Sequence, residues 1–177
     1  IVVDGINSTG GIIIPKLLEA LNVEVIKINC IPDGNFAHDP EPLDKNLDQL
    51  KEEVLKSNSD LGIAVDPDVD RLVFVSENGE TISEENTLIS CADYILSKEK
   101  GSAVSNLSSS MGLRDICKVY GVEYFSSTVG EINVVEKMKS VNAIIGGEGN
   151  GGIIYPESHY GREALVGIGL LLTSLAL

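Results

Sequence analysis

The sequence of 177 residues is long enough for one sizeable domain or two small ones. Its 43% of hydrophobic and 23% of charged residues are typical of a globular chain and exclude a disordered one. The formal net charge of −14 argues against nucleic acid and against a membrane surface as partners, and no apolar stretch is long enough to span a bilayer.

Three cysteines, Cys30, Cys91 and Cys117, lack the spacing of a metal site and favour free thiols in a reducing, cytoplasmic location. The chain starts at Ile1 inside an expected strand and stops inside an expected helix, so we expect it to be part of a longer protein.

Alternating apolar and helical patterns predict a compact α/β arrangement before residue 83. The polar turn 6–11 matches neither a P-loop nor a dinucleotide fingerprint, so we interpret it as a strand-to-helix turn in which Ser8 or Thr9 caps the helix. The expected elements are a strand at 1–5, a helix reaching Leu21, a strand at 23–28, a proline-containing loop at 30–42, a helix at 43–55 and strands at 60–65 and 72–76.

The central motif is DPDVDR at 66–71, between two short apolar runs rich in β-branched residues. Asp66, Asp68 and Asp70 occupy alternate positions of a tight loop, so their carboxylates can converge if the loop curls. Three close negative charges require a cation, and hard oxygen ligands indicate Mg²⁺ or Ca²⁺. Arg71 adds a fixed cation that can bind a carboxylate or a phosphate.

Two alternatives stay open for this loop. It could be a solvated acidic turn. It could also be a calcium loop of the EF-hand kind in a non-catalytic binding module, with Glu77 at the twelfth position, although Arg71 stands where that loop needs glycine and a strand follows where it needs a helix.

The second half of the chain repeats this pattern, and its strand at 143–145 ends in the glycine-rich loop GGEGNGG at 146–152. Five glycines would let the backbone approach a ligand and adopt positive φ. Glu148 could accept hydrogen bonds from two adjacent sugar hydroxyls, and Asn150 offers a donor and an acceptor; alternatively, Glu148 is merely exposed on a hairpin. The further expected elements are a helix from Ser83 to about Lys98, a strand at 102–107, a helix around 113–116, a strand at 122–125, a helix through Met138, a return strand at 153–155 and a final helix.

The two loops lie about 80 residues apart in corresponding places. We therefore predict two similar three-layer α/β domains, at residues 1–82 and 83–177, with mixed, mainly parallel sheets. Each would have its site at the carboxyl end of a strand, where open α/β sheets bind ligands.

Together, DPDVDR and GEGNGG resemble the α-D-phosphohexomutase superfamily, which includes phosphoglucomutase/phosphomannomutase and phosphoglucosamine mutase. The segments VVDGINSTGG, FAHDPEPL, STVGEINVVEKM and YPESHYGREA are also similar to family segments. Family members have four domains, and this chain resembles the second and the third. The resemblance implies partners in the missing domains 1 and 4 of the same chain, and no catalytic residue in this part, since the phosphoserine lies on the first domain.

The resemblance also implies roles for individual residues. Asp66, Asp68 and Asp70 match the aspartates that hold Mg²⁺, and Arg71 matches a supporting arginine that orients a phosphate or carboxylate. The substrate, a hexose phosphate whose phosphate moves between O6 and O1, would meet the loop that contains Gly147, Glu148 and Asn150. Gly152 and Ile132 replace a histidine and a lysine of some members, which leaves the general acid or base unassigned. The GEGNGG loop favours the phosphoglucosamine mutase group.

Overall fold

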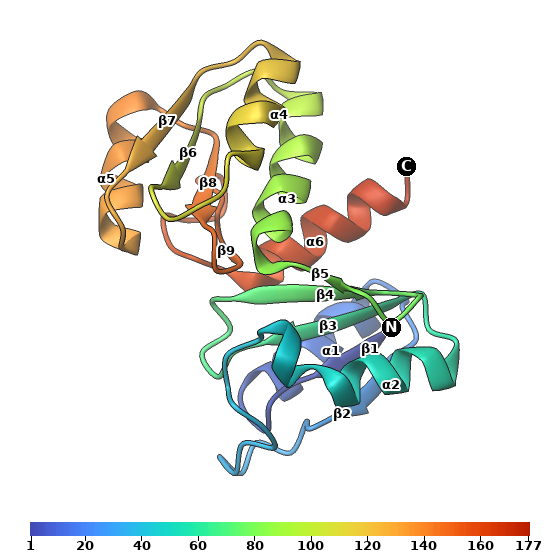
Figure 1. The fold of residues 1–177 in the computed structure, drawn as a ribbon. Helices are drawn as coiled ribbons and strands as arrows, with labels where there is room; N and C mark the ends of the chain where they lie inside the picture. The colour runs from blue at the N-terminus through green and yellow to red at the C-terminus, as the bar shows by residue number, and fades with distance from the viewer. The chain divides into compact units, whose positions relative to one another are not determined.

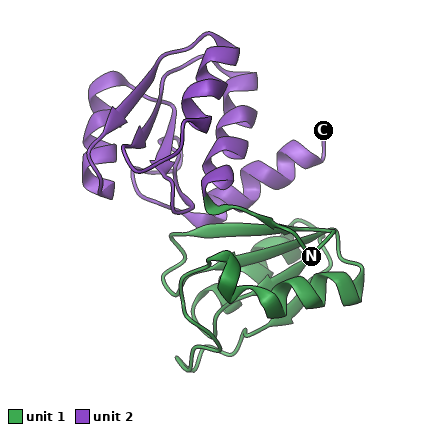
Figure 2. Ribbon diagram, in the orientation of Figure 1, with its two compact units in different colours: residues 1–84 green, residues 85–177 purple.

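The computed structural model describes residues 1–177, which divide into unit 1 (residues 1–84) and unit 2 (residues 85–177), shown in Figure 2. Each unit has one mixed sheet with helices on both faces (Figure 1). The predicted fold class, two similar α/β domains with mainly parallel strands, is confirmed. No helix of either unit combines the length and the apolar character needed to cross a bilayer.

Unit 1 has a five-stranded sheet in the order β2-β1-β3-β4-β5. The first three strands in this order are parallel, and the last two run antiparallel to their neighbours. The elements are β1 (Val2–Asp4), α1 (Gly10–Ala20), β2 (Ile26–Ile28), the 3-10 helix η1 (Asp44–Asn46), α2 (Asp48–Ser57), β3 (Leu61–Val65), β4 (Leu72–Ser76) and β5 (Thr81–Ile82).

Helices α1 and α2 cover opposite faces of the unit 1 sheet (Figure 1). The periodicity of α2 places Leu50 and Val54 in a core with Val2, Ala64 and Val75 of the strands. The helix expected at 43–55 is instead a 3-10 turn followed by α2, and the main chain leaves helical geometry at Leu47, which is fully buried. The apolar pattern thus marked the buried face correctly, but it missed this break.

Unit 2 has a four-stranded sheet in the order β7-β6-β8-β9, in which only β9 is antiparallel. Helix α5 covers one face, and α3, α4 and α6 lie on the other (Figure 1). The elements are α3 (Glu84–Lys98), β6 (Ala103–Asn106), α4 (Gly112–Tyr120), β7 (Tyr124–Ser127), α5 (Glu131–Val141), β8 (Ile145–Glu148), β9 (Gly152–Ile154) and α6 (Ala164–Leu175).

The sheet orders β2-β1-β3-β4 and β7-β6-β8-β9 are equivalent strand by strand. In each, the third strand along the chain turns into an antiparallel return strand, and the two motifs singled out in the sequence occupy these two turns. The shared topology therefore places both motifs at the carboxyl end of a parallel strand, where open α/β sheets bind ligands.

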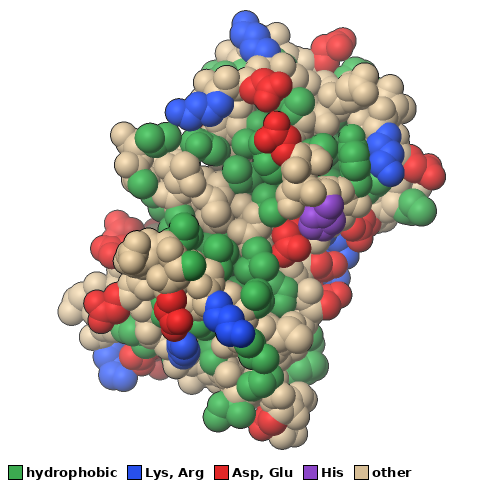
Figure 3. All heavy atoms as spheres, turned by 180° about the vertical axis from the view of Figure 1, so that it is seen from behind, with side chains coloured by type: hydrophobic (Ala, Val, Ile, Leu, Met, Phe, Trp, Pro, Cys, Tyr) green, Lys and Arg blue, Asp and Glu red, His purple; other side chains and the backbone are tan.

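Charged side chains of both signs are interspersed over the face that Figure 3 shows.

Candidate functional site

The acidic loop connects β3 to β4, which pair antiparallel from Leu61 with Ser76 to Val65 with Leu72. All residues of β3 are buried, and so are the first four residues of β4, as expected for apolar, β-branched strands. An EF-hand loop needs a helix on either side. The calcium-loop alternative is therefore wrong for this fold, because both flanks are strands of one sheet.

Asp66 organises the loop from its first position. Its Oδ1 atom accepts hydrogen bonds from the backbone N–H groups of Asp70 and Arg71, both at 3.0 Å. Val69 has φ +63°, a left-handed conformation that is unfavourable for a β-branched residue. The surrounding contacts must hold this strained turn, so the loop has a defined shape before any ligand binds.

The shape of the loop brings the predicted metal ligands together. One carboxylate oxygen each of Asp66, Asp68 and Asp70 lies within 4.8 Å of the others. Asp66 is only 6% exposed, which distinguishes the loop from a freely solvated acidic turn. Burial, followed by the neighbouring carboxylates of Asp70 and Asp68, raises the pKa of Asp66 to about 7. The loop therefore holds more negative charge than its own donors stabilise.

These three residues could hold a divalent cation with oxygen ligands. Oxygen atoms on opposite sides of a Mg²⁺ ion are separated by about 4.2 Å, twice the usual bond length. The three carboxylate oxygens lie within 4.8 Å of one another, and they would have to draw closer to share one Mg²⁺ ion, because neighbouring ligands of an octahedral ion are about 3 Å apart. A hard cation would also offset the negative charge that the single guanidinium of Arg71 leaves uncompensated, so the donor set fits Mg²⁺.

Arg71 lies beside the acidic loop and is held there from two sides. Its Nε atom is 3.6 Å from Asp66 Oδ2, and its Nη1 atom donates to Glu41 Oε1 at 2.8 Å. Although burial opposes the charge, Glu41, Asp66 and Asp70 raise the pKa of Arg71 above its ordinary value. Glu41 was missed by the sequence analysis, because nothing local indicates a partner 30 residues away.

The loop that contains Glu41 is fixed at its centre by a buried carboxylate. Asp4, at the end of β1, is 1% exposed and its Oδ2 atom lies 3.1 Å from Nε2 of His38. The other ring nitrogen of His38 lies 2.8 Å from the carbonyl oxygen of Asp39. The hydrogen bond that Asp4 accepts raises the pKa of His38, although burial acts in the opposite direction. These contacts give His38 a structural role, in which it ties the loop to the end of β1.

The turn before α1 contacts the acidic loop directly, which the sequence analysis did not predict. The hydroxyls of Ser8 and Thr9 both donate to the carbonyl oxygen of Pro67, at 2.7 and 2.9 Å. Thr9 is at the N-cap position of α1, but its side chain makes no capping hydrogen bond. The prediction that Ser8 or Thr9 caps the helix with its side chain is therefore wrong: Thr9 has helical backbone angles, φ −60° and ψ −29°, whereas a capping residue is normally extended, and both hydroxyls meet the Pro67 carbonyl instead.

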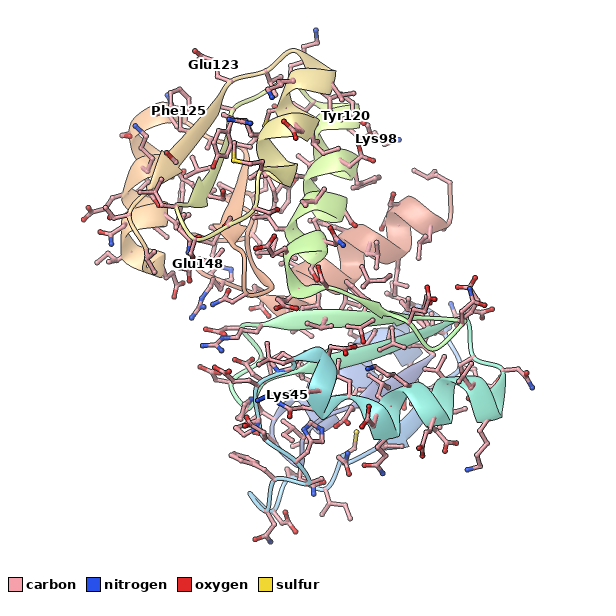
Figure 4. All side chains as sticks on the ribbon, in the orientation of Figure 1. Lys45, Lys98, Tyr120, Glu123, Phe125 and Glu148 are labelled. Atoms are coloured by element: carbon pink, nitrogen blue, oxygen red, sulfur yellow. The ribbon has the colours of Figure 1, made fainter.

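In unit 2, Glu148 is the last residue of β8 and is only 5% exposed, so it is not the exposed hairpin residue of the alternative interpretation. Figure 4 labels Glu148 where β8 ends. Its Oε1 atom accepts from Asn106 Nδ2 at 2.7 Å and from the backbone N–H of Gly130 at 3.2 Å. Its Oε2 atom lies 3.1 Å from Nη1 of Arg162.

These contacts restrict what Glu148 can accept from a ligand. A carboxylate has about four acceptor positions on its two oxygens, and three of them are used within the unit. The remaining position is on Oε2, so Glu148 can accept one hydroxyl without breaking an internal contact. The expectation of two adjacent hydroxyls would require Asn106 or Gly130 to move.

Asn106 is a site residue that the sequence analysis missed. It is the last residue of β6 and is 3% exposed. While its amide donates to Glu148, its Oδ1 atom accepts from the hydroxyls of Ser108 and Ser109, at 3.0 and 2.8 Å. Both serine hydroxyls therefore support Asn106. The position of Asn106 at the carboxyl end of the central strand was the signal that could have identified it.

The glycines of the GGEGNGG loop are needed mainly for close packing. Only Gly151, with φ +88°, adopts the positive φ expected for the loop. A Cβ atom at Gly147 would lie 2.1 Å from the carbonyl oxygen of Gly152, so the β8–β9 pair needs glycine there. The Oδ1 atom of Asn150 accepts from the backbone N–H of Gly152 at 3.2 Å, which fixes this side chain within the turn.

Comparison with known proteins identifies the family to which this chain belongs. A model of phosphoglucomutase/phosphomannomutase, alpha/beta/alpha domain II, matches residues 1–79, and the model of domain III matches residues 83–177. A phosphoglucomutase/phosphomannomutase of Thermococcus kodakarensis is 38% identical over 165 residues, which are 92% of this chain and 36% of that protein. A "Probable phosphoglucosamine mutase" of Methanosarcina barkeri is 41% identical over 152 residues, 85% of this chain and 35% of that protein.

Among solved structures, a phosphoglucomutase/phosphomannomutase family protein from Burkholderia thailandensis superimposes with a TM-score of 0.88 at 26% identity, over 98% of this chain and 39% of that one. The chain thus spans roughly a third of the curated relatives that it matches. The resemblance inferred from the two loop motifs is confirmed. This chain belongs to the phosphoglucomutase/phosphomannomutase family, of which it contains the α/β/α domains II and III.

Proposed function

We propose that this chain is the metal-binding and sugar-binding middle of a Mg²⁺-dependent phosphohexomutase, which moves a phosphate between O6 and O1 of a hexose. The observation that carries the proposal is the convergence of Asp66, Asp68 and Asp70 at the end of β3, in a unit that matches family domain II. A buried carboxylate, Glu148, ends the corresponding strand of the unit that matches domain III.

In this proposal Asp66, Asp68 and Asp70 hold Mg²⁺, while Ser8 and Thr9 fix the loop through the Pro67 carbonyl. Bound Mg²⁺ would neutralise negative charge on the phosphoryl group during its transfer. The outer contacts matter because groups that orient metal ligands are needed for both affinity and activity.

In this proposal Arg71 orients the phosphoryl group, and Glu148 orients the sugar. Arg71, held by Glu41, presents a fixed guanidinium beside the metal loop, where it can bind a phosphoryl oxygen. Glu148 accepts a sugar hydroxyl on Oε2, and Asn150 and the Gly147 backbone complete the sugar loop. We assign no general acid or base to this chain, because no titratable side chain occupies position 152 or 132.

For the substrate, we favour an amino sugar phosphate, as in a phosphoglucosamine mutase. Relatives with that name, each with the qualifier "Probable", are 34–41% identical to this chain. The alternative is a phosphoglucomutase/phosphomannomutase, the name of the Thermococcus kodakarensis relative. We further propose that domains equivalent to I and IV of the family, and the serine that carries the phosphate, belong to the same polypeptide outside this chain.

The test is turnover of the intact protein with Mg²⁺ on glucosamine 6-phosphate, mannose 6-phosphate and glucose 6-phosphate. A strong preference for glucosamine 6-phosphate supports the amino sugar assignment. Comparable rates on glucose and mannose phosphates would overturn that assignment and leave the phosphohexomutase proposal standing. No turnover on any of the three would contradict the proposed activity itself.

A further inference from the structure

Arg162 is an arginine that none of the roles described above uses, although it contacts the proposed sugar residue. It lies just before α6, with its side chain only 15% exposed. Its Nη1 atom is 3.1 Å from Glu148 Oε2, and its Nε atom is 3.4 Å from Glu131 Oε2. The guanidinium therefore bridges a buried carboxylate of the sheet and a carboxylate in the first turn of α5.

The main chain around Arg162 is also fixed. Its backbone N–H donates to Glu131 Oε1 at 2.9 Å. Arg162 forms an isolated antiparallel bridge with Ile154 of β9, and the next residue, Glu163, donates its N–H to the Ile153 carbonyl at 2.9 Å. The segment before α6 thus extends the sheet by one bridge, so the fold fixes the backbone position from which the Arg162 side chain extends.

Gly152 provides the space for the Arg162 side chain. A Cβ atom at position 152 would lie 2.3 Å from Cδ and 3.0 Å from Cγ of Arg162. The aliphatic part of the arginine therefore passes over the position where any other residue at 152 would have its side chain. Gly152 and Arg162 fit each other, and the missing side chain at 152 allows the guanidinium to reach Glu148.

Burying Glu148 as an anion requires compensation, since a buried charge is unfavourable without a partner. Asn106 and the Gly130 N–H supply neutral donors to Oε1, and Arg162 supplies the positive charge at Oε2. Oε2 is also the oxygen with an acceptor position left for a ligand. The direction of that position depends on where Arg162 holds the carboxylate.

We infer that Arg162 is a positioning residue of the sugar site: it holds the Glu148 carboxylate in the orientation that accepts a single sugar hydroxyl on Oε2. The inference rests on the proposed function, because it takes Glu148 as the residue that binds the sugar. Glu131 supports Arg162 from the opposite side, and the absence of a side chain at Gly152 is a condition for the arrangement.

The experiment is a double-mutant cycle on the intact protein, with the KM for glucosamine 6-phosphate and for mannose 6-phosphate measured at saturating Mg²⁺. Arg162→Gln should raise KM about tenfold or more, as expected for a lost hydrogen bond to a charged group. In the Glu148→Gln background the same change should have less than about a twofold further effect, because a residue that acts through Glu148 has nothing left to position. The Mg²⁺ affinity should stay unchanged in all variants.

Two further variants make the test independent of any single substitution. Arg162→Lys should restore part of the lost affinity, because it keeps the positive charge without the planar guanidinium. Gly152→Ala should imitate Arg162→Gln, since its Cβ atom would displace the arginine. Arg114→Gln is the matched control, because Arg114 pairs only with exposed Asp115 on α4 of the same unit, with their closest atoms 3.8 Å apart.

The outcomes separate this inference from the proposed function. The positioning role is overturned, with Glu148 still binding the sugar, if the effects of Arg162→Gln and Glu148→Gln are additive. It is also overturned if Arg162→Gln has the same KM as the control Arg114→Gln. If Glu148→Gln itself leaves KM unchanged, the proposed sugar site fails, and the positioning role fails with it. Thermal unfolding of each variant identifies a loss of affinity that comes only from unfolding.

Discussion

The two units use one topology for opposite electrostatic arrangements. In unit 1, three carboxylates meet at the end of β3, and burial and mutual repulsion raise the pKa of Asp66 to about 7. In unit 2, one carboxylate ends β8 and is met by an amide, a backbone N–H and a guanidinium. Unit 1 thus sets three carboxylates against the single guanidinium of Arg71, whereas unit 2 supplies nearly all the donors that its carboxylate can accept.

This difference indicates what each loop can bind. An excess of oxygen ligands without matching donors is suited to a divalent cation. A carboxylate that is already oriented and almost saturated is suited to one neutral hydroxyl. In both units the residue that ends the first strand along the chain, Asp4 of β1 or Asn106 of β6, is buried and fixes the neighbouring loop by hydrogen bonds. The same strand position therefore supports two different sites.

The largest effect is expected from Asp68→Ala. It should lower the affinity for Mg²⁺ about 100-fold or more, because even outer groups around a metal site contribute about 10–100-fold. The unfolding temperature of the metal-free chain should not fall, since the substitution also removes repulsion. Isothermal titration with Mg²⁺ and Mn²⁺ measures this, with Asp60→Ala, an exposed aspartate just before β3, as the control. Retained affinity in the Asp68 variant would contradict the metal assignment.

Glu148→Gln tests whether the two loops are separate sites. We expect affinity for the hexose phosphate to fall about 10–100-fold, as for hydrogen bonds to a charged group, while Mg²⁺ affinity stays unchanged. Substrate KM and Mg²⁺ titration on the intact protein give both values. A parallel loss of metal affinity would show that the comparison between two independent loops is wrong.

A smaller effect is expected from the double variant Ser8→Ala/Thr9→Val. Both hydroxyls that hold the Pro67 carbonyl are removed, so Mg²⁺ affinity should fall about tenfold, as for outer groups of a metal site. Each single variant should have a few-fold effect. Titration of the four proteins with Mg²⁺ tests this prediction. Unchanged affinity together with lower stability would limit the two hydroxyls to a structural role.

The smallest effect is a pH dependence of stability in unit 1. Asp4 raises the pKa of His38 above its unfolded value, so the folded state binds the proton more tightly. The resulting stability is fully present below about pH 6.5 and is lost as the pH rises through the folded pKa. Urea unfolding at pH 5.5 and pH 8.5 should therefore show that His38→Gln destabilises the chain more at pH 5.5. An equal or larger loss at pH 8.5 would contradict the ion pair.

Much of this account could be predicted from the sequence, for identifiable reasons. The strands around the acidic loop follow from short, apolar, β-branched runs, and the alternate spacing of Asp66, Asp68 and Asp70 lies within one turn. Strand β8 extends instead to Glu148, through glycines that were expected to belong to the loop. The residues that form these features lie close together in the sequence, so the fold class and the convergence of the acids could be predicted without the structure.

The rest depends on contacts that are distant in the chain. Ser8 and Thr9 could cap the helix locally or donate to a carbonyl oxygen 58–59 residues away, and the sequence does not show which hydrogen bond forms. Glu148 receives donors 18 and 42 residues away. The fit between Gly152 and the Arg162 side chain is a matter of volume rather than of motif, so only the folded structure shows it.

The most direct test of the central claim is an anomalous diffraction measurement on crystals of the protein soaked with millimolar Mn²⁺ as a substitute for Mg²⁺. If the three aspartates hold the metal, one strong peak is expected at the β3–β4 loop, about 2.1 Å from a carboxylate oxygen of Asp66, Asp68 and Asp70, with no peak at Glu148. A peak only elsewhere, or no peak at these three aspartates, would contradict the assignment of unit 1 as the metal-binding unit.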